Sequence, residues 1–436
     1  MTSPESANKL NNEGKSSLFQ VFQEKIGPAA TALFLAALAV EAVVVVAEKS
    51  IGSIPYESLI FKATFAASLL RMLTVRYQKK ELPLIAVMLL LGVLSWRLGG
   101  HNEYLRAVAL IAACRGLDVK KILRYVLWGQ LAVCIVLVLL SVFGIFGKVS
   151  ITADFGHGME VRYCLGLGHP NALQCMFYML MLMGMYLFDR YLRWYLYLVL
   201  LVMTLGMYFL TDSRTGLLLG VFSILLSVVL HYPVQDDPGR DEVARFQARS
   251  LGRYFLDIGL RSKKVSYLCG GLAVLASVAG SVYAAVISGP MGYHYGEPDY
   301  AMIWSFDNAL NNRISNLYWT DGAHAGSIET WKPMSDRMSE QFFDMGWVRL
   351  FYWYGIIPAV IAIILILFLL AECYRRRDAQ ALMLIVSLSL YTIIEAHLVS
   401  IYIGRNFLLL LFGAYWSSML FAEKGEGYYL PELVRR

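Results

Sequence analysis

Charged residues are scarce in this sequence. Asp, Glu, Lys and Arg make up 16% of its 436 residues, whereas apolar and aromatic residues make up 58%. A typical soluble globular chain is about 25% charged and about 45–50% apolar. The composition therefore excludes an ordinary soluble domain and indicates an integral membrane protein. Runs such as LIAVMLLLGVL do not alternate as barrel strands do, so we predict an all-α fold.

The sequence also lacks the usual motifs of a metal site. It contains neither Cys-x-x-Cys nor His-Glu-x-x-His, and five of its six cysteines fall in or beside apolar runs. We expect no metal, no cofactor and no disulfide framework. Residues 1–28 lack the cationic start and cleavage site of a signal peptide and are expected to form a cytoplasmic N-terminal segment.

Apolar runs long enough to cross a bilayer follow one another along the chain. We predict about twelve spans, the fourth shorter than usual, within a transmembrane domain at 29–421. The predicted spans lie at 29–47, 54–75, 82–99, 104–114, 124–146, 170–188, 194–211, 215–232, 265–288, 346–371, 379–397 and 406–421.

The distribution of basic residues predicts the orientation of these spans. Lys and Arg concentrate in alternate connections, among them RYQKK, RGLDVKKILR and YRRRD, and are sparse in the others. Basic loops remain in the cytoplasm, so both termini, including the tail at 422–436, are expected there. The cytoplasmic loop at 233–264 has the pattern of an amphipathic helix on anionic lipid, or of a solvated connector. The loop at 289–345 is external, long and rich in aromatics.

Several of the few external basic residues stand at the mouths of spans. RYCLGLGHPN places Arg162, His169 and Asn171 before the sixth span, where the glycines let backbone approach a ligand. The alternative is a snorkelling arginine and an ordinary helix cap. TDSRTG places Ser213 and Arg214 at a helix N-terminus, which favours anions, and Ser213 or Asp212 is expected to cap that helix.

Three further stretches bring polar residues to the same predicted face. NNRISNLYW has the spacing of an amphipathic helix. Such a helix would either offer an arginine to a phosphate and aromatic platforms to sugars, or have only a structural role. FFDMGWVRL begins the tenth span, and EAHLVSIYIGRN joins the eleventh and twelfth. The residues these stretches contribute are Arg313, Tyr318, Trp319, Asp344, Arg349, Glu395 and Arg405. An anionic ligand, most simply a phosphate or pyrophosphate, explains arginines on a face that topology disfavours.

The order of these motifs resembles the O-antigen ligase and Wzy-type polysaccharide polymerase superfamily. RYCLGLGHPN, SRTG, an arginine with aromatics in a long loop and D-x-G-x-x-R-L before YWYGII carry the resemblance, over about residues 30–420. The early spans and RGLDVKK also fit the capsule or exopolysaccharide branch. The resemblance implies a GT-C-like, metal-independent glycosyltransferase that uses undecaprenyl-pyrophosphate-linked oligosaccharides as donor and acceptor outside the inner membrane.

The resemblance also implies roles for particular residues. Arg214 and Arg313 match the arginines that engage pyrophosphate in the ligases, whereas Asp344-Met345 replaces the ligases' His-Asn, which favours a polymerase. We expect Asp344 to be the base, with His324, Glu395 and His169 as alternatives. A flippase and a chain-length regulator are candidate partners, and no nucleic acid is expected. The rival functions are a ligase with another acceptor and a lipid-linked oligosaccharide flippase.

Overall fold

The apolar runs fold into helices, and each of the twelve predicted spans falls on at least one of them. The computed structural model describes residues 18–51, 56–154, 158–231, 263–294, 296–310, 312–319, 324–337, 339, 341, 343–376, 378–399 and 406–421. The N-terminal half contains α2 (Leu18–Ile51), α3 (Glu57–Thr74), α4 (Leu82–Gly99), α5 (Glu103–Ala113), α6 (Val119–Val142), α7 (Pro170–Leu187), α8 (Trp194–Thr211) and α9 (Arg214–His231). The C-terminal half contains α11 (Lys263–Tyr293), α12 (Ala301–Ala309), α13 (Arg313–Trp319), α14 (Gly346–Tyr354), α15 (Ile356–Arg376), α16 (Ala379–Tyr391) and α17 (Leu408–Phe421).

The helices support an all-α membrane protein. Six of those described are long and apolar enough, by length and composition, to cross a membrane: Phe22–Ser50 within α2, then α4, α6, α8, Tyr267–Tyr293 within α11, and α15. Helices α9, α16 and α17 contain shorter apolar stretches. Many large apolar side chains on α4, α6 and α8 are exposed, as expected where lipid replaces water.

Helix α16 forms the centre of the bundle. It contacts α7, α9, α11 and α15, and nearly all of its side chains are buried. A helix that is apolar on every face is stable only when other helices or lipid surround it. The Tyr178 hydroxyl on α7 joins it to its neighbours, because this hydroxyl lies 2.9 Å from Ser223 Oγ on α9 and 3.5 Å from the Ser387 carbonyl oxygen on α16.

Two elements differ from the sequence prediction. Residues before α7 form an antiparallel hairpin of β1 (Ser150–Asp154) and β2 (Met159–Tyr163), although the prediction was wholly helical. The tenth predicted span is two helices, because Gly355 has φ +98° and separates α14 from α15. Segment 332–335 packs into this break, where the Ile356 amide donates to the Lys332 carbonyl oxygen at 2.9 Å and the Ser335 amide donates to that of Tyr354 at 3.3 Å.

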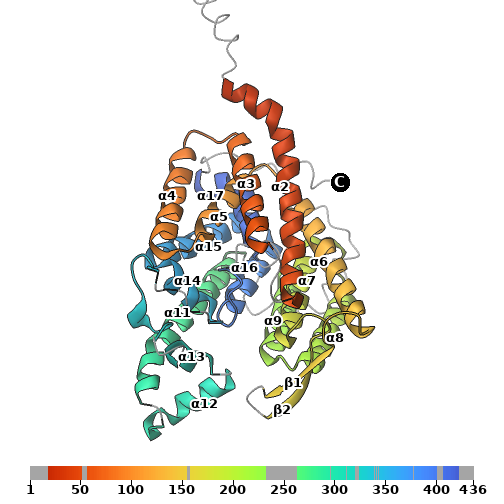
Figure 1. Cartoon of the computed structure of the whole chain (residues 1–436), viewed down its shortest axis with the longest axis vertical. Coiled ribbons are helices and arrows are strands. Elements are labelled where there is room, and N and C mark those ends of the chain that lie inside the picture. The colour runs from red at the N-terminus through yellow and green to blue at the C-terminus, as the bar shows by residue number, and fades with distance from the viewer. Residues whose placement is uncertain are drawn as a thin grey trace, which may run out of the picture.

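The long loop predicted at 289–345 is partly helical, as expected. It contains the end of α11, helices α12 and α13, and two single turns at Pro298–Tyr300 and Ile328–Thr330; a third such turn, Asp189–Tyr191, precedes α8. Helices α12 and α13 and the hairpin lie together at the bottom of Figure 1, which we call the hairpin end, whereas α2 begins at the opposite end. Residues 1–17, most of the predicted loop at 233–264 and the tail at 422–436 lie outside the described residues.

Candidate functional site

Arg313 opens α13, and a buried carboxylate fixes its position. Both oxygens of Asp307 on α12 accept backbone N–H groups of α13, from Ile314 at 2.7 Å and from Ser315 at 3.0 Å. The Asp307 side chain is fully buried. Because the first N–H groups of a helix have no partner within it, a carboxylate there stabilises and orients the helix. Asp307 thereby positions the first residue of α13.

Arg313 lies between two carboxylates that come from distant segments. Its Nη2 is 3.5 Å from Glu395 Oε1 and 3.8 Å from Asp344 Oδ2, and we call these three residues the Arg313 site. The Arg313 side chain is only 10% exposed, whereas that of Asp344 is 51% exposed. Charge-assisted hydrogen bonds are usually about 2.7–2.9 Å long, so both pairs are loose. Arg313 Nη1 is buried and has no hydrogen-bond partner among the described residues.

A glycine brings the two carboxylates to the same arginine. Gly346 begins α14, and a Cβ there would lie 2.7 Å from the carbonyl oxygen of Glu395. The Trp347 amide donates to the Thr392 carbonyl oxygen at 3.2 Å, which joins α14 to the turn after α16. Asp344, two residues before Gly346, is therefore held beside Glu395. The D-x-G spacing has a structural reason, since a side chain at the third position would separate the two acids.

The turn that carries Glu395 is also held from α7. Cys175 Sγ on α7 lies 2.9 Å from His397 Nε2, and both side chains are buried. The Tyr391 ring stacks on the His397 imidazole with centroids 4.7 Å apart. The His397 amide in turn donates to the Glu395 carbonyl oxygen at 2.9 Å. Helix α7 thus fixes the same turn that Gly346 contacts from α14.

Arg162 on β2 is engaged by two acids. Its Nη2 donates to Glu160 Oε2 at 2.7 Å and to Asp212 Oδ2 at 3.0 Å, and we call these residues the Arg162 cluster. Asp212 ends α8 in a left-handed conformation with φ +50°. The hairpin is therefore tied to the α8–α9 turn. Binding of a substrate by Arg162 stays a prediction. In this structure the guanidinium contacts the protein's own carboxylates.

His169 connects the Arg162 cluster with the Arg313 site electrostatically. Its Nδ1 accepts the Asn171 amide at 3.1 Å, so His169 is the N-cap of α7. The imidazole is partly desolvated and lies near the Arg162 guanidinium, and both effects lower the pKa of His169 below its ordinary 6.5, while Asp344 partly opposes them. Because His169 responds to both charges, the two clusters lie at the same end of the bundle. The Asn171 side chain is exposed beside it.

Ser213 and Arg214 lie where the sequence predicted. Ser213 Oγ accepts the Gly216 amide at 3.4 Å, which confirms Ser213 as the cap of α9. Arg214 is exposed at the first position of that helix, one residue from Ser213 and two from Asp212 of the Arg162 cluster. Within the part of the chain that the structure describes, no contact joins Arg214 to Arg313 or Asp344. Its guanidinium is thus accessible at the hairpin end.

Other predicted residues lie apart from the Arg313 site. The Tyr318 ring packs over Gly292 of α11 and lies 4.0 Å, between centroids, from His324, so both belong to an aromatic cluster at the far end of α13. Half of Trp319 is exposed. The Arg349 guanidinium lies 3.5 Å above the Trp353 ring, which stacks on His101 of the α4–α5 connection. Arg405 lies outside the described residues.

The glycines before α7 serve the fold. A Cβ at Gly168 would lie 2.3 Å from the Lys49 carbonyl oxygen, and one at Gly166 would lie 2.7 Å from that of Leu137. Both glycines have positive φ, of +73° and +84°. In this structure the close approach of the glycines is to α2 and α6, and their approach to a ligand stays a prediction.

Four contributors escaped the sequence analysis: Asp307, Gly346, Glu160 and His397 as a partner of Cys175. Asp307 stands six residues before Arg313, a separation that reveals nothing until α12 and α13 fold back on each other. Only Gly346 had a visible signal, in the D-x-G spacing. Among the described residues, no group of three or more His, Cys, Asp or Glu side chains is arranged to hold a metal ion.

No family model, no curated protein and no solved structure matches this chain.

Proposed function

We propose that this protein is a membrane glycosyltransferase that polymerises oligosaccharide repeat units carried on undecaprenyl pyrophosphate. In this proposal the twelve predicted segments cross the membrane in a GT-C-like bundle, both termini are cytoplasmic and the hairpin end faces outward. The observation that carries it is the guanidinium of Arg313, which is nearly buried, loosely paired and short of one hydrogen-bond partner at one end of an apolar helix bundle.

The Arg313 site can support the chemistry of such a transfer. A sugar hydroxyl of the acceptor attacks the anomeric carbon of the donor, a new C–O bond forms, and the bond to pyrophosphate breaks. Asp344, more than half exposed, accepts the proton of the attacking hydroxyl. Arg313 and Arg214 stabilise the negative charge that develops on the leaving pyrophosphate. No metal is required when guanidinium groups take this part.

The carboxylates of Asp344 and Glu395 repel a polyanionic ligand, so the pyrophosphate has to bind away from them. The Arg162 cluster and Arg214 lie on the α8–α9 side, whereas Asp344 and Glu395 lie on the α14–α16 side of Arg313. We place the pyrophosphate toward Arg214 and the acceptor sugar toward Asp344. In this proposal Arg313 contacts both reactants.

The decisive experiment compares polymer length in cells that carry Arg313→Ala, Arg214→Ala or the control Arg193→Ala. Arg193 is exposed just before α8, at the opposite end of that helix from Asp212 of the Arg162 cluster. We expect loss of long polymer in the first two variants at normal membrane abundance, with single lipid-linked repeats on the outer leaflet, and normal polymer in the control.

Other outcomes favour the rival functions. Repeats trapped on the inner leaflet indicate a flippase. Normal polymerisation with loss of transfer to a second acceptor indicates a ligase. Unchanged glycans in both site variants contradict the proposal.

A further inference from the structure

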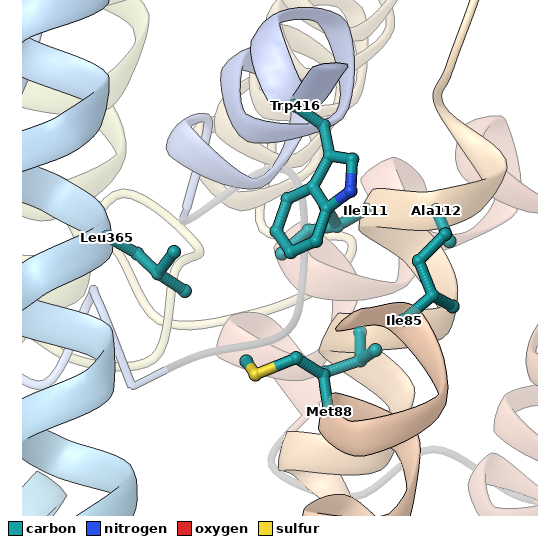
Figure 2. A pocket seen from close by; sticks show the side chains of 7 residues that line it. Ile85, Met88, Ile111, Ala112, Leu365 and Trp416 are labelled. Atoms are coloured by element: carbon teal, nitrogen blue, oxygen red, sulfur yellow. The ribbon is translucent and has the colours of Figure 1, made fainter. Parts of the chain in front are cut away.

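A crevice lined by apolar side chains lies between α4, α5, α15 and α17. Figure 2 shows Ile85 and Met88 of α4, Ile111 of α5, Leu365 of α15 and Trp416 of α17 converging on it. Helices α4 and α15 are two of the candidate membrane spans. In the membrane bundle proposed above, the crevice lies at the depth of the hydrocarbon, where no water is available to fill an apolar space.

The crevice continues toward the site as a larger cavity of about 120 Å³. The two share Met88, Val108, Ile111 and Leu365 in their walls. The larger cavity is also apolar through most of its lining, and its few polar groups are at Glu103, Tyr104, Tyr354 and Asn406. Walls that are mostly apolar favour apolar matter, as an engineered apolar cavity of roughly 150 Å³ takes benzene.

One wall of this cavity is the segment that carries Glu395. Leu398 and Val399 line the cavity three and four residues after Glu395. The Asn406 side chain donates to the Leu398 carbonyl oxygen at 3.1 Å and so closes the same wall from α17. Leu350 and Tyr354 of α14 form another wall, on the helix that follows Asp344. The apolar space thus borders the two segments that carry the acids of the Arg313 site.

We propose that this cavity binds the part of an isoprenoid lipid chain nearest to its phosphate. This inference rests on the proposed function, which requires a polyprenyl lipid whose pyrophosphate reaches Arg313. By comparison with benzene, the cavity holds about one five-carbon isoprene unit. The crevice of Figure 2 is then placed to receive the next part of the same lipid. A methyl-branched unit fills such a widened pocket, whereas a straight acyl chain leaves part of it empty and loses contacts.

The test is photolabelling of the purified full-length protein in lipid nanodiscs. The probe is a polyprenyl monophosphate that carries a benzophenone near its phosphate. We expect labelled peptides from the helices that line the cavity, α4, α5, α14, α15 or α17, and several-fold weaker labelling in the presence of unlabelled polyprenyl phosphate but not of added phosphatidylglycerol. Equal competition by the phospholipid, or labelling confined to other helices, would overturn the proposal.

Two variants on one helix sharpen the test. Ala362→Phe fills the cavity, whereas Ile364→Phe adds a similar ring on the lipid-exposed side of α15, where Ile364 is 45% exposed. Labelling should fall several-fold in the first variant and stay unchanged in the second. Equal labelling in both contradicts the assignment.

Labelling needs no turnover, so it separates this proposal from the proposed function. If Arg313→Ala leaves cellular polymer intact while the cavity is still labelled with isoprenoid selectivity, the lipid site stands and the polymerase proposal fails. If polymer is lost in Arg313→Ala but the cavity is never labelled, the polymerase proposal stands and the lipid site fails.

Discussion

Arg313 Nη2 and Glu395 Oε1 lie 3.5 Å apart, although 82 positions separate the two residues in the chain. The pair joins α13 to the turn after α16. It is too long for a strong charge-assisted hydrogen bond. An anion that binds Arg313 therefore competes with Glu395 for the same guanidinium.

Replacing Glu395 should strengthen anion binding. Glu395→Gln removes a negative charge close to the bound anion, which at such distances is worth about 1–4 kcal/mol near a protein surface. We expect inorganic pyrophosphate to bind about tenfold more tightly in titration calorimetry. Arg313→Gln should abolish binding, and Arg193→Gln serves as the control. Weaker binding to Glu395→Gln would show that the acid helps to hold the anion.

Asp307 should influence anion binding by positioning Arg313, without contacting a substrate itself. Asp307→Ala leaves two buried N–H groups of α13 without acceptors, at a cost of about 1–3 kcal/mol each. Asp307→Asn keeps one acceptor oxygen and should lose less. Thermal unfolding should rank wild type, then Asn, then Ala, and pyrophosphate affinity should follow the same order. Wild-type affinity in a destabilised Ala variant would contradict the positioning role.

Gly346→Ala should uncouple the two acids. The added Cβ would meet the Glu395 carbonyl oxygen at 2.7 Å, and backbone atoms cannot move aside as a flexible side chain can. We expect a large loss of polymer length, with reduced thermal stability. Gly280→Ala is the matched control, because nothing lies within 4 Å of the position of its Cβ. Equal behaviour of the two variants would remove the reason given for the D-x-G spacing.

The pKa of His169 should report on both clusters. Arg162→Gln removes a repelling cation and should raise this pKa, whereas Asp344→Asn removes an attracting anion and should lower it further. Histidine-labelled protein in nanodiscs, titrated by NMR, measures both. Shifts of the same sign would show that the two clusters do not both face His169.

The sign of the pH dependence of stability follows from the same group. The folded-state pKa lies below the ordinary 6.5, so the unfolded chain binds more protons in that range. The contribution of His169 to stability should therefore decline as pH falls below about 6.5. Protonation also removes Nδ1 as the acceptor that caps α7.

The helices could be predicted from the sequence, because an apolar run in lipid has to satisfy its backbone hydrogen bonds within itself, as a helix does. Even the short fourth segment is a helix, α5. The break at Gly355 stayed hidden, because YWYGII is as apolar as the rest of its span and only the packing of segment 332–335 reveals it. The hairpin was not predicted, because strands of five residues are too short to show a clear alternation of apolar and polar side chains.

The site was predicted in part, and the reason differs from residue to residue. Arg313, Asp344 and Glu395 converge as expected, since the sequence placed all three on the same predicted face. Arg349 was grouped with them because it belongs to the same D-x-G-x-x-R-L stretch as Asp344. It lies five residues after Asp344, which is not a helical repeat of the same face, and it stacks on Trp353. The acids that engage Arg162 could not be assigned before the hairpin was known.

The break at Gly355 has a mechanical consequence. Helix α14 spans about 14 Å from this break to Gly346, and Asp344 lies just past its other end. Segment 332–335 binds both sides of the break and belongs to the loop that also carries α13. Because the Gly346 end of α14 is bound to the turn that carries Glu395, a displacement of segment 332–335 would be transmitted along α14 to Asp344 and Glu395 together.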